Sequence, residues 1–207
     1  MMSLLNMLGE VYRQMGLEKE AESWFRASLK SKPDHIPAYL TYARLLADNK
    51  TRKHEAEQQF LKALDIAPKD NTALHQYGRF LVEQGRHSEA AEYFRLATEV
   101  SDPPHFEDVM AAATSYRLSG NLQKAESFYR KGVQLQPELH SAHINLGAFL
   151  HLVGEYEEAE KCYKTALQLK PGDQLTLNNL QRLHAKKSSH SKVISRNTSK
   201  QMSTSRN

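Results

Sequence analysis

A phrase of 18 residues recurs along the chain at a nearly constant distance. It reads GLEKEAESWFRASLKSKP from Gly16, GNLQKAESFYRKGVQLQP from Gly120 and GEYEEAEKCYKTALQLKP from Gly154. In each copy a glycine is followed by alanine five residues later, by an aromatic residue after four more and by proline after eight more. Aligning the chain on this phrase gives five segments of 34 or 35 residues: 2–35, 36–70, 71–105, 106–139 and 140–173. Repeats of this length indicate an array of small supersecondary units, not one globular core.

The residue types at fixed positions of each segment identify the repeat. The tetratricopeptide (TPR) repeat has a period of about 34 residues and two helices, with a characteristic series of leucine, glycine, tyrosine, alanine, phenylalanine and proline. The first segment carries this series as Leu5, Leu8, Gly9, Tyr12, Ala21, Phe25 and Pro33. The resemblance implies an all-α fold, a right-handed superhelical solenoid of five helix–turn–helix repeats.

Elementary packing arguments agree with this interpretation. Positions 4, 7, 8 and 11 of a segment share one face of a first helix, and positions 20 and 24 share one face of a second, because residues three and four apart lie on the same side of a helix. Glycine at position 8 and alanine at position 20 leave room for the two helices to approach closely, and the aromatic at position 24 fills the space beside them. Proline at position 32 ends the second helix. Glycines at the turns, such as Gly16 and Gly154, suit left-handed helix ends.

The two ends of the array differ from its middle. Residues 174–187 predict one further helix that caps the array, and the basic, Ser-rich residues 188–207 predict a disordered tail. At the other end, Leu4, Leu8 and Val11 have no preceding helix to cover them, so further repeats are expected upstream.

Charge and composition disfavour several classes of protein. Six of the 28 lysines and arginines, and no acid, lie in residues 186–207, so the rest of the chain carries 22 basic and 24 acidic residues. A folded basic face for nucleic acid is therefore not expected. Cys162 is the single cysteine, which excludes an internal disulfide. No apolar run approaches the roughly 20 residues that cross a bilayer, and the first residues do not resemble a signal peptide. We expect no membrane insertion by this chain itself.

Two stretches go beyond the general repeat. The joint KSKPDHIPAYLTYARLL between the first two segments, and INLGAFLHLVGEYEEAEKCYKTALQLKPGDQLTLNNLQRL from Ile144, resemble the C-terminal TPR region of the transmembrane and TPR-containing O-mannosyltransferases. In that family a multi-spanning membrane region carries the sugar-transfer site, and the TPR array faces the endoplasmic reticulum lumen and engages protein acceptors, cadherins among them. The resemblance covers residues 1–185. It implies a lumenal, acceptor-binding region of an enzyme whose catalytic part lies in an upstream membrane region.

Two glycosylation sequons fit a lumenal location. They are Asn49-Lys50-Thr51, in a lengthened turn of the second segment, and Asn197-Thr198-Ser199, in the tail. The alternative to the lumenal interpretation is a cytoplasmic TPR scaffold or co-chaperone adaptor. The Lys/Asn clamp of chaperone-binding TPR domains is not present, because the corresponding residues are Asn6, Glu10 and Leu40, and this disfavours the co-chaperone.

The first helices supply the candidate residues for binding a partner, because one side of each faces the concave surface of a TPR array. These residues are Arg44, His75, Gln76, Arg79, Arg117, Asn145 and Asn179. The partner they suit is a protein or an extended peptide acceptor.

A row of amides is the first hypothesis for how such a partner is held. Asn145 and Asn179 lie 34 residues apart at position 6, and Gln76 has the same phase, whereas Thr41 and Ala111 interrupt the row. An amide side chain can donate to a peptide carbonyl and accept from a peptide N–H. The row is similar to the asparagine row of the O-GlcNAc transferases. The alternative is an electrostatic strip made by Arg44, Arg79 and Arg117.

Signatures of catalysis and of cofactor binding are not found in the sequence. It has no glycine-rich phosphate loop, no HExxH and no GxSxG. His140 and His143 have metal-ligand spacing, but His143 occupies a core position of the repeat, so both are interpreted as structural. Cys162 is interpreted as a half-buried small residue. We expect no metal, no cofactor and no catalytic residue within this chain.

Overall fold

The computed structural model describes residues 4–188, which form helices joined by short turns and contain no strand. This confirms the all-α prediction. The first seven helices are α1 Leu4–Gln14, α2 Glu18–Ser31, α3 Ile36–Asp48, α4 Lys53–Ile66, α5 Asn71–Glu83, α6 His87–Glu99 and α7 Phe106–Leu118. They are followed by α8 Leu122–Leu135, α9 His140–Val153 and α10 Tyr156–Leu169, and a last helix covers 174–188.

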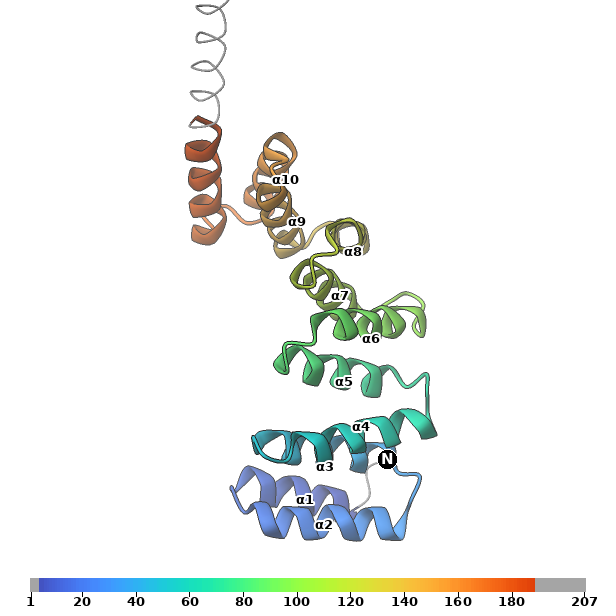
Figure 1. Ribbon diagram of the computed structural model, residues 1–207. Helices are drawn as coiled ribbons and strands as arrows, with labels where there is room; N and C mark the ends of the chain where they lie inside the picture. The colour runs from blue at the N-terminus through green and yellow to red at the C-terminus, as the bar shows by residue number, and fades with distance from the viewer. Residues whose placement is uncertain (1–3, 189–207) are drawn as a thin grey trace, which may run out of the picture. The chain divides into compact units, whose positions relative to one another are not determined.

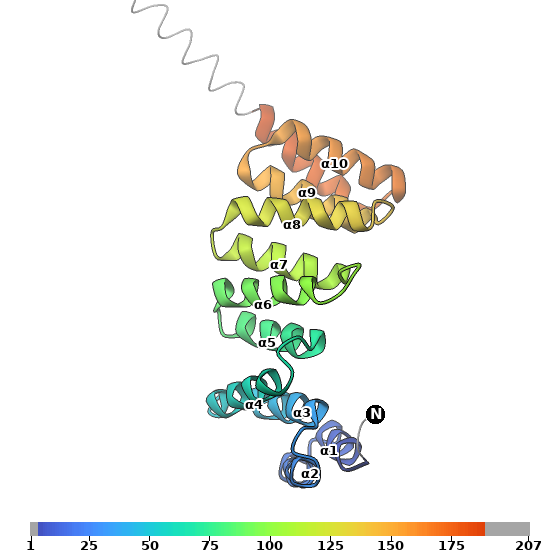
Figure 2. The same ribbon diagram turned by 90° about the vertical axis from the view of Figure 1, so that its right-hand side faces the viewer.

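The chain divides within α8 into two compact units, Met1–Ala125 and Glu126–Asn207. In the first unit α1 packs on α2, α3 on α4 and α5 on α6, and each pair also contacts the helix that follows it. Both views show α5, α6 and α7 stacked in succession (Figures 1 and 2). In the second unit α9 packs on α10.

Three of the helix pairs, α1/α2, α5/α6 and α9/α10, are held by a contact between a glycine and an aromatic ring. A Cβ atom placed on Gly9 would lie 2.5 Å from the ring of Phe25, and one on Gly78 would lie 2.9 Å from the ring of Phe94. On Gly147 it would lie 2.9 Å from the ring of Tyr163. The alanines at position 20 are fully buried; they are Ala21, Ala56, Ala90, Ala125 and Ala159. In these three pairs the aromatic ring of the second helix lies directly against the backbone of the first, which leaves no room for a side chain at position 8.

A ladder of polar contacts joins successive helix pairs in the first unit. In this Glu–Tyr ladder a second-helix glutamate accepts a hydrogen bond from a tyrosine of the next first helix, at 2.7 Å for Tyr42 to Glu22, 2.7 Å for Tyr77 to Glu57 and 2.9 Å for Tyr116 to Glu92. Each carboxylate also pairs with a basic side chain near the following turn, at 2.6 Å for Arg52, 2.5 Å for Arg86 and 3.1 Å for Lys124. Neighbouring pairs are thus joined by charge-assisted hydrogen bonds as well as by apolar contact.

The helix ends follow from proline and glycine. Helices α2, α8 and α10 each end two residues before a proline, because the residue before proline is driven out of the helical region. Gly154 ends α9 with φ of 92°, in the left-handed region that favours glycine. In the helix over 174–188, Thr176 and Leu183 are buried. The predicted disordered tail, 188–207, lies outside the described residues apart from Ser188.

Candidate functional site

Three adjoining hollows form a groove in the first unit. The central hollow, of about 660 Å³, is lined by side chains of α1, α3, α5 and α7, with Phe60 of α4 at its floor. A second hollow, of about 460 Å³, shares Arg44, Thr72 and Gln76 with it. A third, of about 380 Å³, shares Arg79 and Glu83 with the central hollow. We call the three together the first-unit groove.

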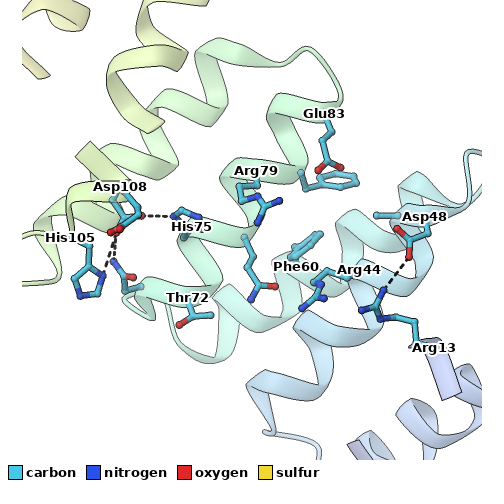
Figure 3. Close-up of a pocket in the computed structure, with 15 residues that line it drawn as sticks. Arg13, Arg44, Asp48, Phe60, Thr72, His75, Arg79, Glu83, His105 and Asp108 are labelled. Atoms are coloured by element: carbon cyan, nitrogen blue, oxygen red, sulfur yellow. Dashed lines mark hydrogen bonds and ion pairs between the residues drawn. The ribbon is translucent and has the colours of Figure 1, made fainter. Parts of the chain in front are cut away.

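Four of the seven candidate binding residues line the first-unit groove, namely Arg44, His75, Gln76 and Arg79. Figure 3 shows that Arg44, His75 and Arg79 reach the central hollow from α3 and α5. The structure therefore brings together Arg44 and Arg79, which occupy the same position of two successive first helices, with His75 and Gln76 of the second of those helices.

A network of charges occupies the α1 and α3 end of the central hollow. Arg13 donates to Glu10 at 2.7 Å and lies 3.6 Å from Asp48, and Arg44 lies 3.7 Å from Glu10. The hydrogen bond from Arg13 lowers the pKa of Glu10, with a smaller contribution from the charge of Arg44. Two arginines and two carboxylates thus balance one another at this end.

His75 is held by a buried carboxylate that the sequence analysis missed. Asp108 is 1% exposed, and its Oδ1 lies 2.5 Å from His75 Nδ1. Its Oδ2 accepts from Asn71 Nδ2 at 2.8 Å, and His105 Nδ1 lies 3.7 Å away. The His75 ring also packs edge-on against Phe94, with 5.5 Å between ring centroids. His75 is therefore fixed in place within the wall of the groove.

A signal for Asp108 was present in the sequence. It occupies position 3 of its segment, where three of the other four segments have small buried residues, Ala38, Ala73 and Ala142, and the first has Leu4. A carboxylate at a position that is otherwise alanine and buried needs hydrogen-bond donors nearby. Those donors come from α5, one repeat earlier in the chain.

Gln76 and Arg79 are two groove residues with unused hydrogen-bonding capacity. Gln76 Oε1 is buried and has no hydrogen-bond partner among residues 4–188. Arg79 is exposed and forms no hydrogen bond or ion pair with any residue of that range through its side chain. One is an acceptor in need of an N–H group, and the other is a cation with five donors.

The remaining candidate residues lie elsewhere. Arg117 is half-buried on α7 and lines none of the three hollows of the first-unit groove. In the second unit, Asn145 is exposed on α9 and Asn179 is half-buried in the helix over 174–188. Asn6, which stands where a chaperone-binding clamp would have one of its residues, has a fully buried side chain, and its Oδ1 accepts from Thr41 Oγ1 at 2.7 Å.

The turn between α3 and α4 contains the Asn49 sequon. Asn49 Oδ1 accepts hydrogen bonds from the Thr51 N–H at 3.0 Å and from Thr51 Oγ1 at 2.8 Å. Asn49 is half-exposed, and Lys50 and Thr51 are exposed. The other sequon, at Asn197, lies outside the described residues.

Other candidate chemistry has structural explanations. His143 Nε2 lies 2.7 Å from the carbonyl oxygen of Pro137, and no group of three possible metal ligands occurs among residues 4–188. Cys162 is buried, and burial raises the pKa of its thiol to about 11, so it is a poor nucleophile. Within the described range, every helix falls short of the length and apolarity required to span a bilayer.

Comparison with known proteins places the chain in a family. Profiles described as tetratricopeptide repeat match residues 3–35, 42–105, 110–139 and 140–173. The chain is 45% identical over 181 residues to protein O-mannosyl-transferase TMTC2 of Homo sapiens, a match that covers 87% of this chain and 21% of that protein. It is 30% identical over 213 residues to protein O-mannosyl-transferase TMTC1 of Homo sapiens, covering 85% of this chain and 24% of that protein. The chain thus spans only about a quarter or less of either relative.

A solved structure shows the same fold. YrrB, described as a TPR protein with an unusual peptide-binding site, superposes with a TM-score of 0.67 at 20% identity, over 88% of this chain and 90% of that one. Together with the profile matches and the recurring glycine–ring contact, this likeness establishes that the chain belongs to the tetratricopeptide repeat family and has its helical solenoid fold.

Proposed function

We propose that this chain is the acceptor-binding region of a protein O-mannosyltransferase. The observation that carries the proposal is the 45% identity to a protein O-mannosyl-transferase over 87% of the chain. The repeat itself requires only a few residues in each segment, such as the turn glycines and the position-20 alanines, and 45% identity over 181 residues is more than those few can supply. The sugar-transfer chemistry is assigned to the part of the relatives that lies outside the match.

The first-unit groove supports a binding role. An extended polypeptide presents N–H and C=O groups at regular intervals, and a groove that holds it must supply the complementary acceptors and donors. Gln76 supplies a buried acceptor without a partner, and Arg79 supplies unused donors. Arg44 and Arg117, with Asn145 and Asn179 of the second unit, are the further proposed contacts. The peptide-binding site named for YrrB is a precedent in the same fold.

The proposed location is the lumenal side of the endoplasmic reticulum, and the proposed acceptors are cadherin-like extracellular domains. Asn49 tests the location because its sequon lies in a surface turn. When the natural full-length protein is expressed in animal cells, we expect a glycan at Asn49 that is removed by an endoglycosidase and abolished by Thr51→Val. An unmodified Asn49 peptide in mass spectra would favour a cytoplasmic scaffold.

Direct binding tests the acceptor role. The purified chain is titrated with a cadherin extracellular domain and with a synthetic peptide from one of its Ser/Thr-bearing strands, using calorimetry. We expect saturable binding that Gln76→Ala combined with Arg79→Ala weakens roughly tenfold or more, because each lost hydrogen bond leaves a buried group unpaired. Lys62→Ala removes an exposed charge of α4 outside the groove and is the matched control.

The amide row is tested in the same assay with Asn145→Ala combined with Asn179→Ala. Weaker binding by a well-folded double variant would support a contribution of the second unit. Equal binding would limit the contact surface to the first-unit groove. If neither the domain nor the peptide binds the unaltered chain, the proposed function is wrong.

A further inference from the structure

The charges of the central hollow are unevenly satisfied. Arg13 and Arg44 share the carboxylates of Glu10 and Asp48, and Asp108 is bonded to His75 and Asn71. The unpaired charges among the described lining residues are those of Arg79, Glu83 and Glu107. Figure 3 places Arg79 between His75 and Phe60 near the middle of the hollow and Glu83 at its edge.

Arg79 therefore determines the charge that a partner meets in the middle of the groove. Its neighbour His75 is already held by Asp108 at 2.5 Å, so the His75 ring could bind a partner's anion beside Arg79 only if that contact were broken. The four charges at the α1 and α3 end already balance one another. The other unpaired charges of the lining, Glu83 and Glu107, are acidic, so Arg79 is the lining group that can receive a carboxylate. A guanidinium can bind a carboxylate through two parallel hydrogen bonds.

The third hollow adds an apolar subsite directly beside Arg79. It is shared with the central hollow through Arg79 and Glu83. The rest of its lining is mainly apolar, with Val82, Phe94, Met110, Ala111 and Leu118. Leu118 is 45% exposed, so a partner side chain that covered it would remove apolar surface from water.

Gln76 adds a backbone contact on the other side of Arg79. It lies one helical turn earlier on α5 and lines both the central and the second hollow. Its buried Oε1 requires an N–H donor, and an extended backbone carries one at each residue that is not proline. In an extended chain, residues i and i+2 point to the same side, roughly 6–7 Å apart.

We propose that the first-unit groove selects an extended segment with an acidic residue followed or preceded, two positions away, by a large apolar residue. The acidic side chain binds Arg79, the apolar side chain enters the hollow lined by Val82, Met110 and Leu118, and a backbone N–H is accepted by Gln76 Oε1. The inference rests on the proposed function, since it names the chemistry of the partner for the same groove. It adds a sequence preference that a backbone-only grip would not have.

The test uses four fluorescein-labelled synthetic peptides of equal length and the purified chain, with binding followed by fluorescence anisotropy. The parent contains Ser-Glu-Thr-Leu-Ser between glycine–serine flanks. In the other three, glutamine replaces the glutamate, lysine replaces the glutamate, or alanine replaces the leucine. We expect the glutamine and alanine peptides to bind roughly tenfold more weakly than the parent, and the lysine peptide to bind more weakly still. Added salt should weaken the two peptides that keep the glutamate, the parent and the alanine peptide, more than the glutamine peptide.

Variants of the chain assign each preference to its residue. Arg79→Ala should abolish the difference between the glutamate and glutamine peptides and keep the preference for leucine over alanine. Met110→Ala should reduce the leucine preference and keep the charge preference. Lys62→Ala is the charge-matched control. Because Arg79 is exposed and its side chain forms no hydrogen bond or ion pair with residues 4–188, its removal is not expected to unfold the chain, and circular dichroism checks this.

The outcomes separate the two proposals. Equal binding of glutamate and glutamine peptides, or an unchanged charge preference in Arg79→Ala, overturns this inference. A preference for the lysine peptide also overturns it and assigns the charge selection to Glu83. If a cadherin domain binds the chain while all four peptides bind alike, only the sequence preference is wrong. If nothing binds, the proposed function fails with it.

Discussion

At the scale of single residues, glycine on one helix lets an aromatic side chain of the next helix pack against its backbone. Gly9, Gly78 and Gly147 each lie so close to an aromatic ring that a Cβ atom would meet it at 2.5–2.9 Å. Where the repeat has alanine at position 8, as at Ala43 and Ala113, the side chain is fully buried as well. Close approach of the backbone to a ring is thus the local rule from which the helix pairs are built.

Asp108 is a charged residue at a buried position where three other segments have alanine, and its contact with His75 can be tested. His75→Ala should lower the free energy of unfolding by about 1–3 kcal/mol, because the buried carboxylate loses one of its donors. Adding Asp108→Ala should restore most of that loss, since alanine occupies the same position at Ala38, Ala73 and Ala142. Urea unfolding of both variants, with Arg79→Ala as a neighbour that should cost little, measures the coupling.

The opposite order of stabilities would contradict this account. If the double variant is less stable than His75→Ala alone, Asp108 contributes through partners other than His75. The remaining candidates are then Asn71 and His105, which also lie near its Oδ2.

At the scale of secondary-structure elements, the Glu–Tyr ladder determines how one helix pair is joined to the next in the first unit. Glu22 on α2 receives hydrogen bonds from Tyr42 of α3 and from Arg52 in the turn before α4. The hydrogen bond from Arg52, more than that from Tyr42, lowers the pKa of Glu22 to about 2, against burial, which raises it. Contacts of this kind fix the register between elements that apolar packing alone would allow to slide.

The ladder predicts how stability depends on pH. Because the pKa of Glu22 is lower in the folded state than its ordinary value of 4.5, its contribution is fully present above pH 4.5 and is lost as the pH falls toward 2. Glu22→Gln should therefore be less stable than the unaltered chain at pH 7, and the difference should shrink as the pH falls through that window. Thermal melts followed by circular dichroism would measure it, and a constant difference at every pH would show that the charge of Glu22 contributes nothing.

At the scale of the whole molecule, α1 has an apolar face that no described residue covers. Leu4, Met7 and Val11 of α1, and Met15 directly after it, are 50–71% exposed, at the spacing of one helix face. Val11 occupies position 10, and the residues at that position in the later first helices are buried; they are Leu45 at 5%, Phe80 at 3%, Ser115 at 2%, Phe149 at 2% and Leu183 at 0%. On α1 the same position is apolar as well, but no other described residue covers it.

This uncovered face predicts where the chain opens first. Each large apolar side chain left in water forgoes about 1.5–3 kcal/mol of burial, so amides of α1 should exchange with solvent faster than those of α3 or α5 in native-state hydrogen exchange. Val11→Ala should cost little, whereas Leu45→Ala, at the same position of a covered helix, should cost about 2–5 kcal/mol. Protection of α1 equal to that of α5 in a monomeric sample would contradict the prediction.

The sequence by itself determined the helix pairs and their internal contact. Residues three and four apart must share a helix face, and a pattern that is repeated five times shows which residues are equivalent. The contact between Gly147 and Tyr163 could therefore be predicted from the sequence. So could the helix ends before Pro33 and Pro171. The choice of Arg44, His75, Gln76 and Arg79 as residues of one groove followed from the same periodicity.

Only the tertiary structure decided which of those side chains are free to bind a partner. His75 is bonded to Asp108, 33 residues later, and Thr41 is bonded to Asn6, 35 residues earlier. Each contact joins neighbouring helix pairs, and whether two side chains one repeat apart actually meet depends on the distance and rotation between the pairs. A pattern within one helix carries no information about that geometry, because it is set by the packing of all the side chains between the two pairs.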